Sequence, residues 1–297
     1  MHTRSLGQGL EVSAVGLGCN NFGRRVDQDG TRAVVDAALD VGVTFFDTAE
    51  SYGNGQSETY LGHALQGRRE QVVLATKFGG GGAVGHGKGA RTEIRKALEG
   101  SLARLQTDHV DLYQHHQEDP DTALDETIEA LDELVREGRI HAYGTSNYSP
   151  ARLEEAAALA QEAYVSEQSE YSWLERDAER ELLATCERLG LGFIPYFPLA
   201  SGLLTGKYRR GEPAPEGTRL EGREIGDEEH DRVEALAAFA AERGATLLDV
   251  AIGGLAAQPP VASVIAGATR PEQVRANAAA GAWEPTAEDL AALGASA

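Results

Sequence analysis

Apolar residues along the chain gather in short runs, and amphipathic segments separate one run from the next. Runs rich in β-branched and aromatic residues predict strands. Eight such runs cover residues 12–18, 43–49, 72–77, 109–116, 140–147, 163–171, 191–199 and 261–268. Most of them are continuously apolar rather than alternating, which is typical of strands buried on both faces of a parallel sheet.

The segments between these runs have the spacing of amphipathic helices. In residues 91–105, 122–138 and 150–163, apolar side chains recur every three or four positions and charged side chains fill the other face. The expected helix boundaries are Thr122 and Ser149 as N-caps, Pro150 at a first helical position, and Gly67, Gly138 and Gly190 at C-termini. Strands that alternate with helices of this length predict an α/β fold, a (β/α)8 TIM barrel.

Some segments depart from strict alternation. Residues 2–16 carry Gly7 and Gly9 between short runs, which predicts an N-terminal β-hairpin before the first barrel strand. Residues 200–230 form a Gly-, Pro- and charge-rich connection that is long enough to suggest a role over the barrel mouth. Additional C-terminal helices are expected at 230–243, 246–257 and 285–297. No linker interrupts the pattern, so residues 1–297 are expected to form a single domain.

The net charge and the cysteine content limit the possible binding partners and the cellular compartment of the protein. The chain has 27 Lys and Arg residues against 47 Asp and Glu residues, a net charge of −20 that repels nucleic acid and anionic membranes. A solvated acidic surface explains this charge, with adaptation to high salt as the lesser alternative. Cys19 and Cys186 offer neither a disulfide framework nor a metal-ligand spacing. No apolar run approaches the ~20 residues that span a bilayer, and no signal peptide is evident, so we expect a cytoplasmic protein.

Titratable side chains stand where three neighbouring predicted strands end. Asp47, Lys77 and His116 close successive strands, and Tyr52 lies in the turn-rich loop after the first of them, FFDTAESYGNGQSE. Barrel enzymes perform their chemistry at this end, because the loops that follow the strands surround one mouth. Each side chain alone has an ordinary structural explanation as a cap or a solvated charge, but their joint occurrence predicts one active site.

These four side chains suit proton donation to a carbonyl oxygen. Tyrosine, with a reference pKa of about 10, is a poor acid at neutral pH. A nearby ammonium group stabilises the phenolate, and a carboxylate holds that ammonium in place. We therefore assign Tyr52 as general acid, Lys77 and Asp47 as its relay, and His116 as the group that orients the substrate oxygen or shares the proton.

The sequence resembles the aldo-keto reductase superfamily over nearly the whole chain. The motifs FDTAESYGNGQSETYLGHAL, LATKFG, SLARLQTDHVDLYQHH, GTSNYSPARLEEA, QSEYSWLERDAE, YFPLASGLLTGKY and IAGATRPEQVRAN occur in the family's order and spacing. They are most similar to the prokaryotic oxidoreductases related to the potassium-channel β subunits. The resemblance implies catalytic roles for Asp47, Tyr52, Lys77 and His116. The family pattern DLYQ-x-H selects His116 over His115, which strand alternation turns to the opposite face.

The resemblance also implies NADPH, bound in an extended form without a Rossmann domain. Positions matching the nicotinamide end are Ser146, Asn147 and Gln168, with Tyr196 stacking on the ring, and positions matching the diphosphate contacts are Leu199, Gly202, Thr205 and Lys207. Positions matching the adenosine end are Gly267, Thr269, Arg270, Gln273 and Asn277. Arg270 in GATRPEQ also stands beside a predicted helix N-terminus, which suits a 2′-phosphate, although a surface arginine is the alternative.

Three other functions have less support from the sequence than carbonyl reduction. Gly82–Lys88 matches the start of a phosphate-binding loop, but Gly89 follows where Ser or Thr would bind magnesium. A metal-dependent hydrolase would use His115, His116, His141 and Asp47, yet the first strand offers Cys19 and Asn20 rather than His-x-His. A nicotinamide-binding regulatory or sensor protein with slow turnover is the third. We expect a small-molecule carbonyl substrate, whereas its identity, the oligomeric state and the favoured direction are not readable from the sequence.

Overall fold

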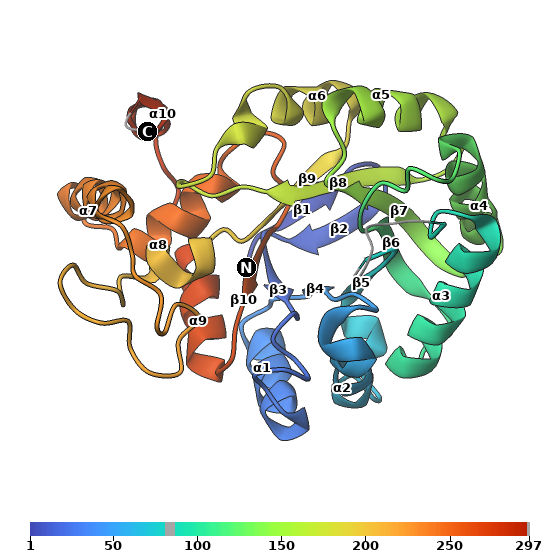
Figure 1. Ribbon diagram of the computed structural model, residues 1–297, viewed down its shortest axis with the longest axis horizontal. Coiled ribbons are helices and arrows are strands. Elements are labelled where there is room, and N and C mark those ends of the chain that lie inside the picture. The colour runs from blue at the N-terminus through green and yellow to red at the C-terminus, as the bar shows by residue number, and fades with distance from the viewer. Residues whose placement is uncertain (81–86, 296–297) are drawn as a thin grey trace.

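Eight parallel strands form a barrel in the computed structural model, which describes residues 1–80 and 87–295 (Figure 1). In chain order they are β3 (Val15–Gly18), β4 (Phe45–Asp47), β5 (Val73–Phe78), β6 (Val110–His115), β7 (Ile140–Ser146), β8 (Tyr164–Glu170), β9 (Gly192–Tyr196) and β10 (Val264–Gly267). From β3 to β9 each strand pairs with the next, and β10 pairs with β3. A parallel bridge between Phe193 and Val261 closes the ring beside β9. The barrel predicted from the sequence is confirmed.

Helices surround the barrel (Figure 1). They are α1 (Gln28–Asp40), α2 (Gln56–Ala64), α3 (Arg91–Leu105), α4 (Leu124–Arg136), α5 (Pro150–Leu159), α6 (Leu182–Leu189), α7 (Asp227–Glu242), α8 (Leu247–Asp249), α9 (Pro271–Ala280) and α10 (Ala287–Ala295). The short α8 continues into a π-helical turn, Val250–Gly254. A large apolar cluster fills the space between the strands and the helices, and a smaller one fills the barrel interior.

The predicted N-terminal β-hairpin is present, and it closes the N-terminal end of the barrel. Its strands are β1 (Thr3–Leu6) and β2 (Leu10–Ser13). Leu6 and Val12 are fully buried in the interior cluster. At Gly7, where φ is +57°, a Cβ atom would lie 2.7 Å from the carbonyl oxygen of Val165, so the close approach of the hairpin to β8 requires glycine. The side chains of the hairpin therefore plug this end of the barrel.

Several element bounds differ from the predicted ones by a few residues, and two of these predictions assigned residues to the wrong element or role. The first barrel strand was expected at 12–18, but residues 12 and 13 belong to β2 and the barrel strand begins at Val15. Thr122 was expected as an N-cap, but α4 begins at Leu124 and the Thr122 hydroxyl instead donates to Asp119 at 2.6 Å. Ser149 does cap α5, accepting from the amide of Arg152 at 3.3 Å, with Pro150 as the first helical residue.

The predicted 200–230 connection contains one short element, a 3-10 turn at Ala200–Thr205, before α7 begins at Asp227. Among the described residues, no helix is both long enough and apolar enough to cross a membrane. Cys19 and Cys186 are both buried and free.

Candidate active site

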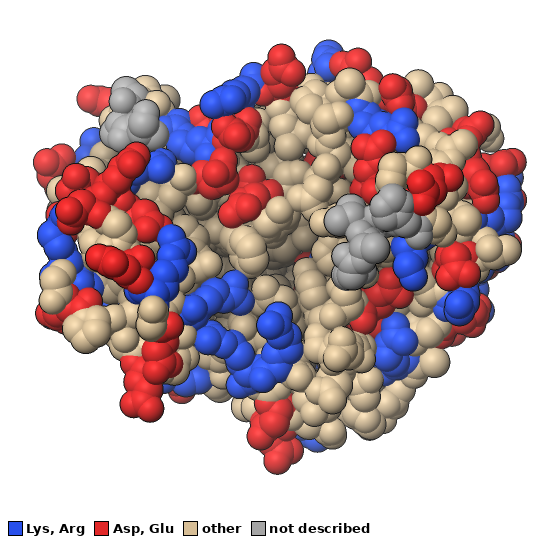
Figure 2. Space-filling view, in the orientation of Figure 1, with Lys and Arg blue, Asp and Glu red and all other residues tan. Residues whose placement is uncertain are grey.

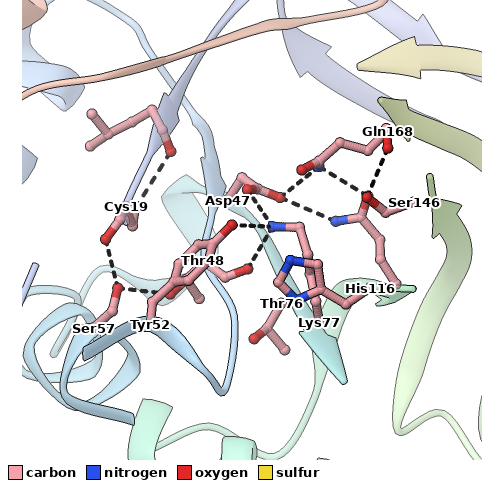
Figure 3. Close-up of polar contacts among 12 residues, drawn as sticks. Cys19, Asp47, Thr48, Tyr52, Ser57, Thr76, Lys77, His116, Ser146 and Gln168 are labelled. Carbon is pink, nitrogen blue, oxygen red and sulfur yellow. Dashed lines mark hydrogen bonds and ion pairs between the residues drawn. The ribbon is translucent and has the colours of Figure 1, made fainter. Parts of the chain in front are cut away.

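The barrel brings the four predicted catalytic side chains together at its C-terminal mouth (Figure 3). Asp47 is the last residue of β4, Lys77 is the fifth of six in β5, and His116 follows β6 directly. Tyr52 begins the 3-10 turn after β4. Asp47 lies opposite Ala75 in the register and Lys77 opposite Gln114, so these side chains point into one space from three adjacent strands.

The ammonium group of Lys77 is the centre of this arrangement. Its Nζ donates to Asp47 Oδ2 at 2.5 Å, to the carbonyl oxygen of Thr48 at 2.9 Å, and to the Tyr52 hydroxyl at 3.5 Å. Lys77 is fully buried, so its three N–H donors find protein partners in place of water. The predicted contact between Asp47 and Lys77 is therefore a buried ion pair that reaches the tyrosine.

Burial and charge act in opposite directions on this pair. Burial alone would lower the pKa of Lys77, but Asp47 and the Tyr52 hydroxyl outweigh it and raise that pKa, so the amine stays charged. Burial raises the pKa of Tyr52 above its usual 10, although Lys77 lowers it. The sequence argument anticipated the effect of Lys77 but not the larger effect of burial. Tyr52 therefore carries its proton at neutral pH, as a proton donor must.

The two adjacent histidines face opposite sides, as alternation predicted. The His116 ring meets the Tyr52 ring edge-on with centroids 5.9 Å apart, whereas His115 stacks on Phe78 at 4.8 Å and its Nδ1 lies 2.9 Å from the Tyr148 hydroxyl. Burial, with a smaller contribution from Lys77, lowers the pKa of His116 to about 3. His116 is consequently a neutral imidazole at physiological pH.

Gln114 is a site residue that the sequence argument missed. Its Nε2 donates to Asp47 Oδ1 at 3.1 Å, and the Nε2 of Gln168 donates to the same oxygen at 3.0 Å. One carboxylate oxygen of Asp47 therefore accepts hydrogen bonds from the two glutamines, and the other accepts from Lys77. The alternation of side chains along a strand could have identified Gln114, because it stands two residues before His116 and therefore faces the same side.

The residues predicted to meet the nicotinamide end are linked to one another. Ser146 Oγ donates to the backbone oxygen of Gln168 at 2.8 Å, and the Tyr196 hydroxyl donates to Asn147 Oδ1 at 2.8 Å. Asn147 adopts a φ of +64°, which turns the chain away from β7 at this point. Through Gln168 this group is continuous with Asp47 and the catalytic candidates.

Comparison with known proteins decides the family. Residues 14–296 match the aldo/keto reductase family. This chain belongs to that family.

Its relatives include channel-associated and bacterial proteins. A probable voltage-gated potassium channel subunit beta from Oryza sativa subsp. japonica is 37% identical over 295 residues, covering 93% of this chain and 90% of the relative. The uncharacterized oxidoreductase YrpG from Bacillus subtilis (strain 168) is 39% identical over 285 residues, covering 90% and 86%. The solved aldo-keto reductase AKR11C1 from Bacillus halodurans (holo form) superposes with a TM-score of 0.85 and 34% identity, covering 100% of this chain and 96% of that one. The chain is an oxidoreductase of the aldo/keto reductase fold.

The remaining predicted cofactor positions of this aldo/keto reductase lie along two loops that follow β9 and β10. After β9, the Leu199 carbonyl accepts from the Gly202 amide at 2.7 Å, and Thr205 Oγ1 donates to the Gly202 carbonyl at 2.7 Å. A Cβ on Gly202, where φ is +95°, would lie 2.6 Å from Lys207 Nζ. This turn therefore places the lysine amine close to the buried backbone of Gly202.

The loop after β10 leads into α9. Gly267 ends β10, and a Cβ there would lie 3.2 Å from Asn21 Nδ2. Thr269 donates through its amide and hydroxyl to Gln273 Oε1 at 2.7 and 3.1 Å, and Arg270 is the N-cap of α9. Asn277 is buried on the same helix. These positions make up the predicted adenosine end.

The sequence argument missed three further arginines at this mouth, Arg24, Arg25 and Arg219. Arg219 lies 5.4 Å from the centre of the Phe197 ring, next to Tyr196, and its Nη2 donates to Asn21 at 3.4 Å. Burial, together with the charges of Arg25 and Arg24, lowers the pKa of Arg219. Within residues 1–80 and 87–295, none of the three forms an ion pair with a carboxylate. Figure 2 shows Lys and Arg side chains gathered along one edge of the central hollow of this acidic protein, where they favour an anion.

The metal-dependent hydrolase hypothesis is contradicted by the positions of its proposed ligands. His141 lies at the start of β7, beside Asp111 at 3.1 Å, at the opposite end of the barrel from Asp47. The four ligands that the hypothesis needs are therefore not brought together.

The phosphate-loop rival lies mostly outside the described residues. At its end, the amides of Gly87 and Gly89 donate to the Asp119 carboxylate at 3.0 and 2.7 Å. A carboxylate of the protein therefore engages these two amides.

Proposed function

We propose that this aldo/keto reductase is an NADPH-dependent enzyme that reduces aldehydes or ketones to alcohols. The observation that supports this most directly is Lys77 Nζ, which contacts both the Asp47 carboxylate and the Tyr52 hydroxyl in a buried position. Such an arrangement places a proton donor next to a charge that stabilises its conjugate base. Bound NADPH would supply the hydride that adds to the carbonyl carbon.

The protein's own residues would then handle the oxygen. Tyr52 donates its proton to the carbonyl oxygen as negative charge develops there, and Lys77 stabilises the resulting phenolate until solvent returns a proton. His116, being neutral, donates a hydrogen bond that orients that oxygen. Asp47 keeps Lys77 charged and is itself held by Gln114 and Gln168.

The cofactor fits the donor set on this mouth. Ser146, Asn147 and Gln168 offer hydroxyl and amide groups for a carboxamide, and Tyr196 offers a ring face. Lys207, Arg219 and Arg270 are cations without a carboxylate partner among the described residues, which suits a diphosphate and a 2′-phosphate. The family and the donor types support a nicotinamide cofactor, and the choice of NADPH over NADH is our proposal.

The test combines a substrate screen with one substitution. NADPH oxidation is followed spectroscopically over a panel of aldehydes and ketones, with wild-type protein and with Tyr52→Phe. We expect turnover of at least one carbonyl, reduced by roughly 10²- to 10⁴-fold in Tyr52→Phe because the general acid is lost. NADPH affinity, measured by fluorescence, should stay nearly unchanged. Tyr60→Phe, on the neighbouring helix α2, is the matched control and should retain full activity.

The channel-subunit relatives favour one alternative, a nicotinamide-binding regulatory protein with slow turnover. Tight NADPH binding without turnover of any carbonyl in the panel would support that alternative. Turnover of Tyr52→Phe within a few-fold of the parent would contradict the assignment of the general acid.

A further inference from the structure

A second polar cluster lies at the end of the barrel opposite the candidate active site. His109 precedes β6, Asp111 is the second residue of β6, and His141 is the second residue of β7. The register places Val110 opposite Ile140 and Leu112 opposite Ala142, so Asp111 and His141 are cross-strand neighbours. His109 shares a face with Asp111 because the two are separated by one residue.

The donor atoms of these side chains converge. One atom from each of the three residues can be chosen so that all lie within 4.8 Å of one another. His141 Nδ1 lies 3.1 Å from Asp111 Oδ1, and the two imidazole centroids are 4.6 Å apart. Tetrahedral zinc, with bonds near 2.1 Å, needs donors about 3.4 Å apart. The His141 and Asp111 donors are already close to this spacing, and the His109 donor lies within 4.8 Å of both.

Neighbouring groups orient these donors as they do around bound metals. Asp108 Oδ1 lies 2.7 Å from His109 Nδ1, which holds a proton on that nitrogen and leaves Nε2 free to bind. Asp111 Oδ2 accepts from Arg69 Nη2 at 2.7 Å and from the Leu74 amide at 2.8 Å, which leaves Oδ1 for a ligand. The carboxylates of Asp108 and Asp111 outweigh the single charge of Arg69.

We propose that His109, Asp111 and His141 bind one Zn²⁺ ion, with water in the fourth position. Two imidazoles and one carboxylate suit zinc better than magnesium or calcium, which prefer oxygen donors. The His141 side chain is 50% exposed and gives the ion a route from solvent. The site joins the starts of β6 and β7 at the end of the barrel that supports stability rather than chemistry, so zinc stabilises the fold. This site is independent of the proposed reductase function.

The experiment is a calorimetric titration of Zn²⁺ into chelator-treated protein at pH 7.5. We expect one ion per chain, with affinity at least tenfold weaker in His109→Ala and in His141→Ala. His2→Ala, which removes a surface histidine elsewhere, should bind like the parent. Zinc should raise the Tm of the parent and not that of His141→Ala, and Co²⁺ in place of zinc should show the visible absorption of a tetrahedral site.

Folding and activity are checked separately. Far-UV circular dichroism of each alanine variant establishes that it is folded, and carbonyl reduction should be the same with and without zinc. Because the titration reads zinc directly, it gives its answer even if the protein reduces no carbonyl. Equal zinc affinity in His141→Ala and the parent, or no saturable binding by the parent, would overturn the proposal.

Discussion

At the scale of single residues, the hydrogen bonds of Lys77 explain how a charged amine can be buried at the mouth of the barrel. Its three donors are accounted for by Asp47, Thr48 and Tyr52. An amine with unsatisfied donors in this position would lose its proton or destabilise the fold. The contacts that hold Lys77 charged therefore include the one that connects it to Tyr52, the proposed proton donor.

Lys77→Met tests this relay through pH dependence. Because Lys77 lowers the pKa of Tyr52 against the effect of burial, its removal should raise that pKa further. In alcohol oxidation, which needs the tyrosinate, the rising limb of kcat against pH should move to higher pH, and carbonyl reduction should fall roughly 10²- to 10⁴-fold. Asp47→Asn should be milder because Lys77 remains.

Lys96→Met is the matched control, since the Lys96 side chain is 78% exposed on α3. It should leave both rate and profile unchanged. A Lys77→Met enzyme with the parent pH profile would show that the amine does not set the acidity of Tyr52.

At the scale of elements, both faces of β8 carry residues that shape the candidate active site. Gln168 points inward to Asp47, whereas Glu167 points outward and is fully buried. The Glu167 carboxylate accepts from the Thr145 and Ser169 hydroxyls at 2.6 and 2.7 Å and from the Tyr148 amide at 3.1 Å. It therefore fixes the turn that presents Asn147.

Glu167→Gln tests this element through stability. Burial raises the pKa of Glu167 from 4.5 to about 7. The unfolded chain gives up this proton near pH 4.5 and the folded chain near pH 7, so the folded protein binds more protons in this window. The free energy of unfolding should therefore fall as pH rises through the window, by up to roughly 3 kcal/mol from this group.

The glutamine variant should lack this part of the slope in denaturant titrations between pH 4.5 and 7.5. Its absolute stability should also drop, because an amide nitrogen cannot accept from the donors around it. Glu187→Gln, an exposed change on α6, should keep the slope of the parent. Parallel curves for Glu167→Gln and the parent would show that Glu167 does not titrate in this range.

At the scale of the whole molecule, the distribution of charge matters more than its sum. A chain of net charge −20 disfavours any anionic ligand unless cations gather locally. Arg24, Arg25 and Arg219 come together from loops far apart in the sequence, and Arg270 stands at the start of α9. The mouth is thereby suited to a phosphorylated cofactor despite the acidic surface.

Arg270→Ala tests cofactor choice. If Arg270 pairs with the 2′-phosphate, NADPH should bind more tightly than NADH, and the substitution should remove most of that preference. A charge-assisted hydrogen bond contributes about 1.5–3 kcal/mol, or roughly one to two decades of affinity. Added salt should weaken NADPH binding more than NADH binding, because NADPH carries the extra phosphate charge.

Arg275→Ala on the same helix makes the same change in net charge and should leave the preference intact. If the parent binds NADPH and NADH equally, Arg270 faces solvent and the 2′-phosphate assignment is wrong.

The sequence by itself determined the barrel, the hairpin and the positions of Asp47, Tyr52, Lys77 and His116, because period-two and period-3.6 patterns and strand ends are local properties of the chain. It missed Gln114, the Arg219 cluster and the grouping of His109 with Asp111 and His141. It also missed the start of β3 and the role of Thr122. These depend on register, on loop paths and on which neighbour satisfies a polar group, and the net pKa of Tyr52 depends on burial. Only the tertiary structure decides such features, since they arise between residues that are distant in the chain.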